Sequence, residues 1–272
     1  MTDRLLEAVR GGVRTFDLGR PMFVGMPQSP NHPQFWHTLP RRHGDSVRAD
    51  GGSAANDLIV TGTHVGTHID ALAHVSHEGR LHGGADAGAA LDRGRFMEHG
   101  VHTIAPLVRP AVLLDVPAAL GGETCGPAYE ITARDLERTA SQQDVVVSRG
   151  DVVLVRTGWG RRFGDGPEAY LGKESGVPGV GEQGAKWLAD HEVLAAGADT
   201  IAFERLAPGT GHSLLPAHRV LLVDAGIYII EALNLEELAS GRVYEFTFVL
   251  SPLNIVGATG SPVRPLAVIA DA

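Results

Sequence analysis

The sequence predicts a mixed α/β fold that forms one domain over residues 1–272. Short runs rich in β-branched and aromatic residues recur along the chain, bounded by Gly, Pro, Asp or Asn, as is typical of short strands. Helical segments are fewer and fall irregularly between these runs, which favours a mixed sheet over a regular doubly wound one. The 35 glycines and 16 prolines suit many tight turns. No linker-like change of composition divides the chain, so we expect a single domain.

The segments can be placed by their local signals. Thr132 is a plausible N-cap with an acid at Asp135, which predicts a helix from Ile131 to about Gln142. Asn234 is predicted to cap a second helix that ends at Gly241. Strands are expected at 58–60, 111–116, 151–159, 200–203, 219–223, 226–230, 244–250 and 266–270, a further helix at 184–191, and long loops at 121–129 and 164–184.

Composition narrows the class of protein. A net charge of −9 argues against a nucleic-acid partner, which requires a concentrated basic surface. No apolar run approaches the roughly 20 residues of a membrane span, and residues 1–12 lack the apolar region of a secretory signal. Cys125 is the only cysteine, so no internal disulfide can form. We therefore expect a cytoplasmic protein that acts on a small molecule.

The histidines are unevenly distributed. Five of the thirteen, at positions 64, 68, 74, 77 and 82, lie within 19 residues of the segment 61–84. Clustering alone is compatible with a solvated loop, so the spacing within the cluster must carry the argument. His77 and His82 have no supporting spacing and are expected to be exposed loop residues.

His64, His68 and Asp70 form the predicted metal-ligand set. His64 and His68 are four residues apart, so a helix would place them on one face, and a tight loop at Gly66 would direct both imidazoles inward equally well. Two imidazoles and a carboxylate suit Zn²⁺, Mn²⁺ or Fe²⁺ and leave positions open for water and substrate. A structural zinc site would be expected to use more cysteine. The set therefore predicts a catalytic metal.

His74 lies four residues after Asp70. If a helix begins at Ile69, His74 shares a face with Asp70, near the metal but separable from it. A histidine in that position can take a proton from an attacking water or give one to a leaving group. We therefore predict a catalytic role for His74.

The spacing resembles the signature H-x-G-T-H-x-D-x-P-x-H of the cyclase-like metal-dependent hydrolases, which include bacterial kynurenine formamidases and isatin hydrolases. The chain matches it at His64, His68, Asp70 and His74, with Leu72 in place of the proline. That replacement disfavours kynurenine formamidase proper and favours the isatin hydrolase-like and uncharacterised branches. The resemblance seen in the residues extends over most of the chain.

A second match lies near the C-terminus, where His218 and Glu231 correspond to family positions that complete a second metal site or line the active site. The resemblance leaves one or two ions, Mn²⁺ or Zn²⁺, open. A turn at 224–226 between these residues would let a hairpin-like return bring both to one end of the sheet. Because Glu231 follows an apolar run, it needs a compensating charge if it is buried.

The resemblance further implies a compact mixed β/α fold of the swivelling β/β/α type, and a homodimer or homotetramer with partner residues near the site. It implies hydrolysis of a carbon–nitrogen bond in an aryl formamide, an isatin-like cyclic amide or a lactam. A metal would activate water and polarise the carbonyl, and His74 would protonate the departing nitrogen. Phe35, Trp36 and His37 could stack on a planar substrate, although core or interface packing explains Phe35 and Trp36 equally well.

Other functions remain open. The same metal and base can hydrolyse a lactone or another ester. A non-catalytic metal- or ligand-binding protein is a different class, but it would have no need of a free base such as His74. The chain contains neither a G-x-S-x-G nucleophile elbow nor a G-x-G-x-x-G dinucleotide loop after a strand, which disfavours serine hydrolases and dinucleotide enzymes.

Overall fold

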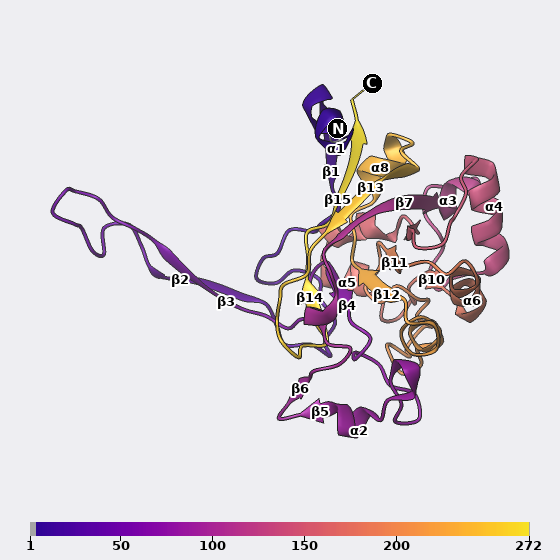
Figure 1. The fold of residues 1–272 in the computed structure, drawn as a ribbon, viewed down its shortest axis with the longest axis horizontal. Helices are drawn as coiled ribbons and strands as arrows, with labels where there is room; N and C mark the ends of the chain where they lie inside the picture. The colour runs from indigo at the N-terminus through magenta and orange to yellow at the C-terminus, as the bar shows by residue number, and fades with distance from the viewer. Residues whose placement is uncertain (1–3, 272) are drawn as a thin grey trace.

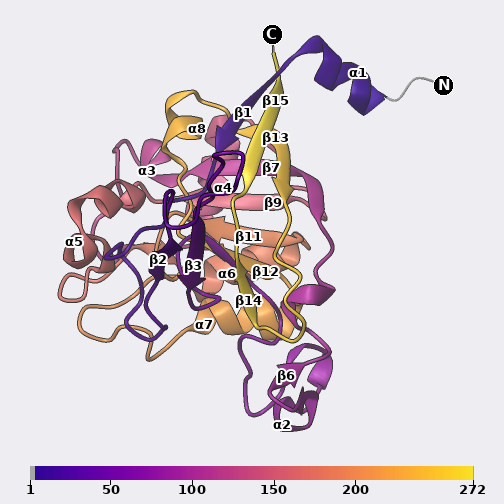
Figure 2. The same cartoon turned by 90° about the vertical axis from the view of Figure 1, so that its left-hand side faces the viewer.

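The computed structural model describes residues 4–271, and its centre is a nine-stranded mixed sheet (Figure 1). The four middle strands are parallel and every outer pairing is antiparallel. Figure 2 shows the spatial order of the strands across the sheet, which differs from their order along the chain. Their order is β1 (Val13–Asp17), β15 (Leu266–Ala270), β13 (Glu245–Leu250), β7 (Leu107–Asp115), β9 (Val152–Arg156), β11 (Ala195–Ala198), β12 (Tyr228–Glu231), β4 (His68–Asp70) and β14 (Gly260–Pro262).

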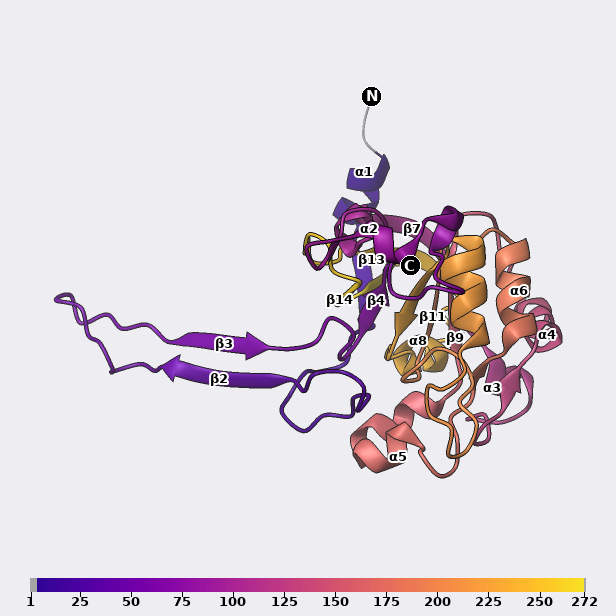
Figure 3. The same cartoon turned by 90° about the horizontal axis from the view of Figure 1, so that it is seen from below.

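Alternate residues of the buried strands feed two separate cores. In β9, Val153 and Val155 pack against one cluster, whereas Val152 and Leu154 pack against the other, as the two-residue period of a strand requires. The first core lies beneath α4 (Ala133–Gln143), α6 (Glu182–Asp190) and η4 (Arg219–Ala225), which cover one face of the sheet (Figure 3). Burial on both faces explains why the central strands are continuous apolar runs.

Short elements surround the sheet. The remaining helices are α1 (Arg4–Gly11), α2 (Ala87–Ala90), α3 (Val116–Ala119), α5 (Pro167–Leu171), α7 (Pro216–His218) and α8 (Glu236–Ser240), with helical turns η1 (His82–Gly84), η2 (Val101–Thr103) and η3 (Trp159–Asp165). Three two-stranded pairs are β2 (Trp36–Arg41) with β3 (Asn56–Val60), β5 (Leu91–Asp92) with β6 (Arg95–Phe96), and β8 (Glu130–Ile131) with β10 (Gly179–Val180). Within residues 4–271, no helix has the length and apolar character required to cross a membrane.

The β2–β3 pair forms a long arm that leaves the body of the protein on the side away from α4 and α6 (Figures 1 and 3). Every residue of both strands is exposed. Large apolar side chains are among them, at Trp36, Leu39, Leu58, Ile59 and Val60. A single two-stranded hairpin is marginally stable in water by itself. The arm therefore exposes large apolar side chains on a hairpin that extends away from the body.

Most predicted elements are confirmed, and the capping box of Thr132 and Asp135 at the start of α4 is present. The strand predicted at 219–223 is wrong, because these residues form η4, whose apolar side chains are buried beside α6. Residues 200–203 form turns instead of a strand. Asn234 does not cap α8, which begins at Glu236, and the predicted loop 164–184 contains α5 and β10. Short apolar runs do not distinguish a strand from a buried helix.

Candidate metal centre

The site is built on β4, close to the edge of the sheet. Because alternate residues of a strand point to the same face, His68 and Asp70 share one face while Ile69 enters the core on the other. β12 pairs with β4 so that Glu231 lies opposite His68. The register between these two strands therefore brings a second carboxylate beside the predicted ligands.

His68 has a defined tautomer. Its Nδ1 lies 2.8 Å from the carbonyl oxygen of Gly66, which can only accept a hydrogen bond, so Nδ1 is the protonated nitrogen. Gly66 adopts a positive φ of 69°, which forms the tight turn that the sequence predicted as one alternative. The other ring nitrogen, Nε2, lies 3.3 Å from Glu231 Oε2 and 3.6 Å from Asp70 Oδ1. In neutral His68 this nitrogen presents a lone pair to two carboxylates.

His64 approaches Asp70 from the loop before β4. Its Nδ1 lies 2.6 Å from Asp70 Oδ1 and its Nε2 lies 2.9 Å from the hydroxyl of Thr259. Gly260 leaves the space for the imidazole, because a Cβ at that position would collide with the His64 ring. β14 thus fixes His64 from the side opposite to β12.

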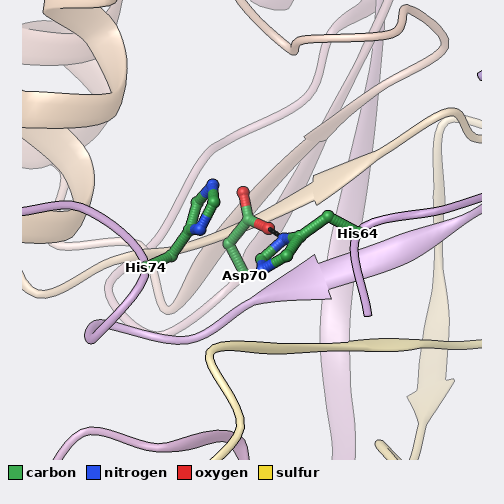
Figure 4. A group of neighbouring side chains, drawn as sticks. All are labelled: His64, Asp70 and His74. Carbon is green, nitrogen blue, oxygen red and sulfur yellow. Dashed lines mark hydrogen bonds and ion pairs between the residues drawn. The ribbon is translucent and has the colours of Figure 1, made fainter. Parts of the chain in front are cut away.

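His74 joins the site without the predicted helix. The chain turns after β4, with the His74 amide donating to the carbonyl of Ala71, and this turn carries the imidazole back over Asp70. The His74 ring stacks on His64 with centroids 3.8 Å apart. Figure 4 shows the Asp70 carboxylate beside both rings. Burial, the largest influence, lowers the pKa of His74 to about 4, which keeps this imidazole neutral at neutral pH.

His218 and Glu231 also reach the site, but not through a hairpin. η4 connects them, and His218 enters from α7. His218 Nε2 lies 3.2 Å from Glu231 Oε1 and 3.8 Å from Asp70 Oδ2. The convergence predicted from the family resemblance is therefore present, although the predicted hairpin path is wrong.

The donor set fits a cation. Among the described residues, Asp70 Oδ2 and Glu231 Oε1 are buried oxygens without a hydrogen-bond partner, an arrangement that is costly unless a positive charge compensates it. Two groups of side chains have ligand atoms within 4.8 Å of one another, and Asp70 belongs to both. The groups are His64, Asp70 and His74, and His68, Asp70 and Glu231.

The same carboxylates perturb the histidines. Burial alone would lower the pKa of His68 and of His218, but the neighbouring carboxylates outweigh it and raise these values to about 9 and about 10. Burial would likewise raise the pKa of Asp70, yet the surrounding imidazoles hold it well below its usual range. A cation can replace the protons that these shifts report, because metal and proton compete for the same nitrogen lone pairs.

The aromatic residues predicted to bind substrate do not gather at this site within one chain. Phe35 is buried in a third core cluster with Val65 and Trp159. Trp36 and His37 lie on the exposed arm, where His37 pairs with Asp57 at 2.9 Å. Their role in binding stays a prediction, and it would require the arm to meet another chain. His77 and His82 are half-buried instead of exposed.

Three residues at the site escaped the sequence analysis. His32 stacks on His64 with centroids 5.4 Å apart, Thr259 holds His64 Nε2, and Glu204 holds His218. Each is distant in sequence from the histidine cluster and belongs to no recognisable spacing. Only the fold brings them together.

Comparison with known proteins places the chain in a family. The Cyclase family model matches residues 16–205. The chain is 27% identical to isatin hydrolase of Roseibium aggregatum over 82% of its length and 78% of that protein. It is 30% identical to kynurenine formamidase of Salinibacter ruber, covering 87% of each chain.

A solved structure gives the same answer for the fold. A crystal structure described as a novel cyclase superposes with a TM-score of 0.84 at 28% identity, covering 98% of this chain and 93% of the other. The expected mixed β/α fold is therefore confirmed, together with the resemblance predicted from the histidine motif. The protein belongs to the cyclase family.

Proposed function

We propose that the protein is a metal-dependent hydrolase that cleaves a carbon–nitrogen bond in a small amide, namely an aryl formamide, an isatin-like cyclic amide or a lactam. The observation that carries the proposal is the convergence of imidazoles on two buried carboxylates, each of which has one oxygen without a hydrogen-bond partner among the described residues. The names of the relatives, isatin hydrolase and kynurenine formamidase, support an amide as the substrate. Leu72, buried at the base of the turn, favours the isatin hydrolase-like branch.

The chain's own residues divide the work. His64, His68 and Asp70 would hold the ion, Mn²⁺ or Zn²⁺, and Glu231 and His218 would complete the site for a second ion or orient the attacking water. When bound, such an ion supplies Lewis acidity that activates water and polarises a carbonyl. Asp70 is the one residue shared by both groups of ligand atoms, which supports it as a bridge if two ions bind.

His74 would transfer the proton. It is neutral near pH 7, so it can accept a proton from the attacking water and then deliver it to the departing nitrogen, which would otherwise leave as a poor anion. His32 stacks on His64 and comes from the loop that precedes β2. It therefore adds a second half-buried imidazole to the wall of the site.

The test is metal analysis of purified protein followed by assays with an aryl formamide, isatin, a lactam and a lactone. Turnover of a carbon–nitrogen substrate that disappears on chelation and returns with Mn²⁺ or Zn²⁺ is the expected result. Activity on the lactone alone would support the ester alternative. Metal binding without turnover of any of these would favour a non-catalytic protein.

Replacing Glu231 by glutamine should lower turnover by about 10²-fold or more while the protein stays folded, because the amide keeps the shape but removes one of the two carboxylate charges. Elemental analysis would show whether an ion is lost with it. Asp17→Asn, which alters an exposed carboxylate paired with Arg264, is the control. Unchanged metal content together with unchanged turnover would place Glu231 outside the working site.

We also propose that the protein is a homodimer or a homotetramer in which the β2–β3 arm packs on another copy. The exposed apolar side chains of an otherwise unsupported hairpin favour such a partner. Packing of the arm on another copy would bring Trp36 and His37 to the neighbouring chain, and the family resemblance implies that partner residues lie near the site.

Replacing Ile59 by aspartate should therefore shift the assembly towards one chain's mass in light scattering, since a charge would be buried at the interface. Val146, which is 74% exposed on the body, gives the control Val146→Asp. A wild-type protein that is monomeric at micromolar concentration would contradict the proposal, as would an Ile59 variant whose mass is unchanged.

A further inference from the structure

Glu204 is a buried carboxylate that contacts His218 at Nδ1, the ring nitrogen opposite to the one that faces Glu231. Only 1% of it is exposed. Its Oε1 accepts hydrogen bonds from the backbone amide of His218 at 3.0 Å and from His218 Nδ1 at 2.6 Å. Its Oε2 accepts from the amide of Ala217 at 3.0 Å. Both oxygens are therefore used, and Glu204 has no oxygen directed towards the centre of the site.

This arrangement decides which nitrogen of His218 carries the proton. Two backbone amides, which can only donate, already point at the Glu204 carboxylate, so its ionised form is the one that they stabilise. An ionised carboxylate can only accept, and Nδ1 must then be the protonated nitrogen. In the neutral imidazole, which is the form that can ligate a metal, Nε2 then carries the lone pair and lies 3.2 Å from Glu231 Oε1, one of the two unpartnered oxygens.

The backbone around Glu204 is held as firmly as its side chain. Glu204 forms an isolated bridge with Val180 of β10. Gly179 lies so close that a Cβ there would collide with the Glu204 backbone. The preceding residue, Phe203, adopts a positive φ of 52°, a conformation that a bulky residue takes only where its surroundings impose it. Glu204 is thus a fixed point from which the His218 ring is oriented.

We propose that Glu204 is a positioning residue that holds His218 in the tautomer and orientation in which Nε2 ligates the metal. The inference rests on the proposed metal-dependent function. Carboxylates that accept a hydrogen bond from the far nitrogen of a ligating histidine make that imidazole a better ligand, and their removal weakens metal binding by about 10- to 100-fold.

The first experiment compares Glu204→Gln with Asp199→Asn. Asp199 is a matched control because its buried carboxylate also accepts backbone amides, from Thr157 and Gly158, but contacts no predicted ligand. In Glu204→Gln, the neutral amide loses the charge that strengthens the hydrogen bond from His218 Nδ1, and in either orientation its nitrogen faces a donor of Ala217 or His218, so the imidazole is held less firmly. We expect metal affinity, measured by titration against a chromophoric chelator, to fall about 10- to 100-fold in this variant and to be unchanged in Asp199→Asn.

Two results would overturn the proposal: a folded Glu204→Gln variant with wild-type metal affinity, or an equal loss of affinity in Asp199→Asn. A wild-type protein that binds no metal would contradict the proposed function itself, which separates that failure from this one.

The second experiment needs no Glu204 variant and so does not depend on the folding of Glu204→Gln. In zinc-loaded wild-type protein with ¹⁵N-labelled histidine, long-range ¹H–¹⁵N spectra distinguish a protonated ring nitrogen from a ligating one, and His218→Gln identifies the His218 signals by their loss. Protonated Nδ1 with ligating Nε2 is expected. An unprotonated Nδ1 on His218 would reject the role of Glu204.

Discussion

Asp70→Ala is expected to lose metal and activity together, with turnover reduced by at least about 10³-fold, more than the loss of one oxyanion-stabilising donor costs. The reason lies in the position of Asp70. It is completely buried, it belongs to both groups of ligand atoms, and one of its oxygens lacks a partner among the described residues. Removing it leaves the facing imidazoles without the charge that a cation needs.

Elemental analysis of the purified variant, alongside assays with the substrate found for the wild-type protein, measures both effects. Asp199→Asn serves again as a control for the loss of a buried carboxylate, and circular dichroism would confirm that both variants are folded. Full metal occupancy in Asp70→Ala would show that Asp70 is not a principal ligand. Normal turnover without metal would remove the basis of the proposed function.

The local half of this site could be predicted from the sequence. His64, His68, Asp70 and His74 lie within one short segment, so their spacing alone restricts where their side chains can point. The path that brings His74 to the site differs from the helix that the sequence predicts. A strand and a turn present His74, because the pairing of β4 with both β12 and β14 overrides the local preference.

The distant half of the site was visible only through the family resemblance or not at all. His218 and Glu231 were identified by similarity, and Glu204 and Thr259 carry no sequence signal. A single glutamate or threonine acquires its role from the strand register and the chain path, which are long-range properties. Spacing arguments reach only as far as one element and its turns.

The fold shows the same limit at 219–223. This run of valines and leucines has strand-like composition, yet it forms η4 because it follows directly from α7 and buries its side chains against the helical layer. The β2–β3 arm was equally hidden, since only its second strand was predicted and nothing in the residues indicates that it leaves the body.

His74→Ala tests whether His74 transfers a proton or ligates the metal. The stacking of His74 on His64 and the position of Asp70 beside both rings place His74 within reach of a metal as well as of a substrate. As a proton-transfer group, His74 should be dispensable for metal binding. We therefore expect the variant to retain its metal and to lose about 10²- to 10⁴-fold in rate, the usual size of a general acid–base contribution.

His77→Ala is the matched control, because His77 lies three residues further along the same segment, is half-buried, and belongs to neither group of ligand atoms. It should retain both metal and rate. The two roles of His74 then separate cleanly: a variant that loses its metal makes His74 a ligand, and a near-normal rate across the pH range excludes it from proton transfer. A substrate analogue with a better leaving group sharpens the result, since a leaving nitrogen that needs no proton should recover most of the lost rate in His74→Ala if protonation of that nitrogen is what His74 provides.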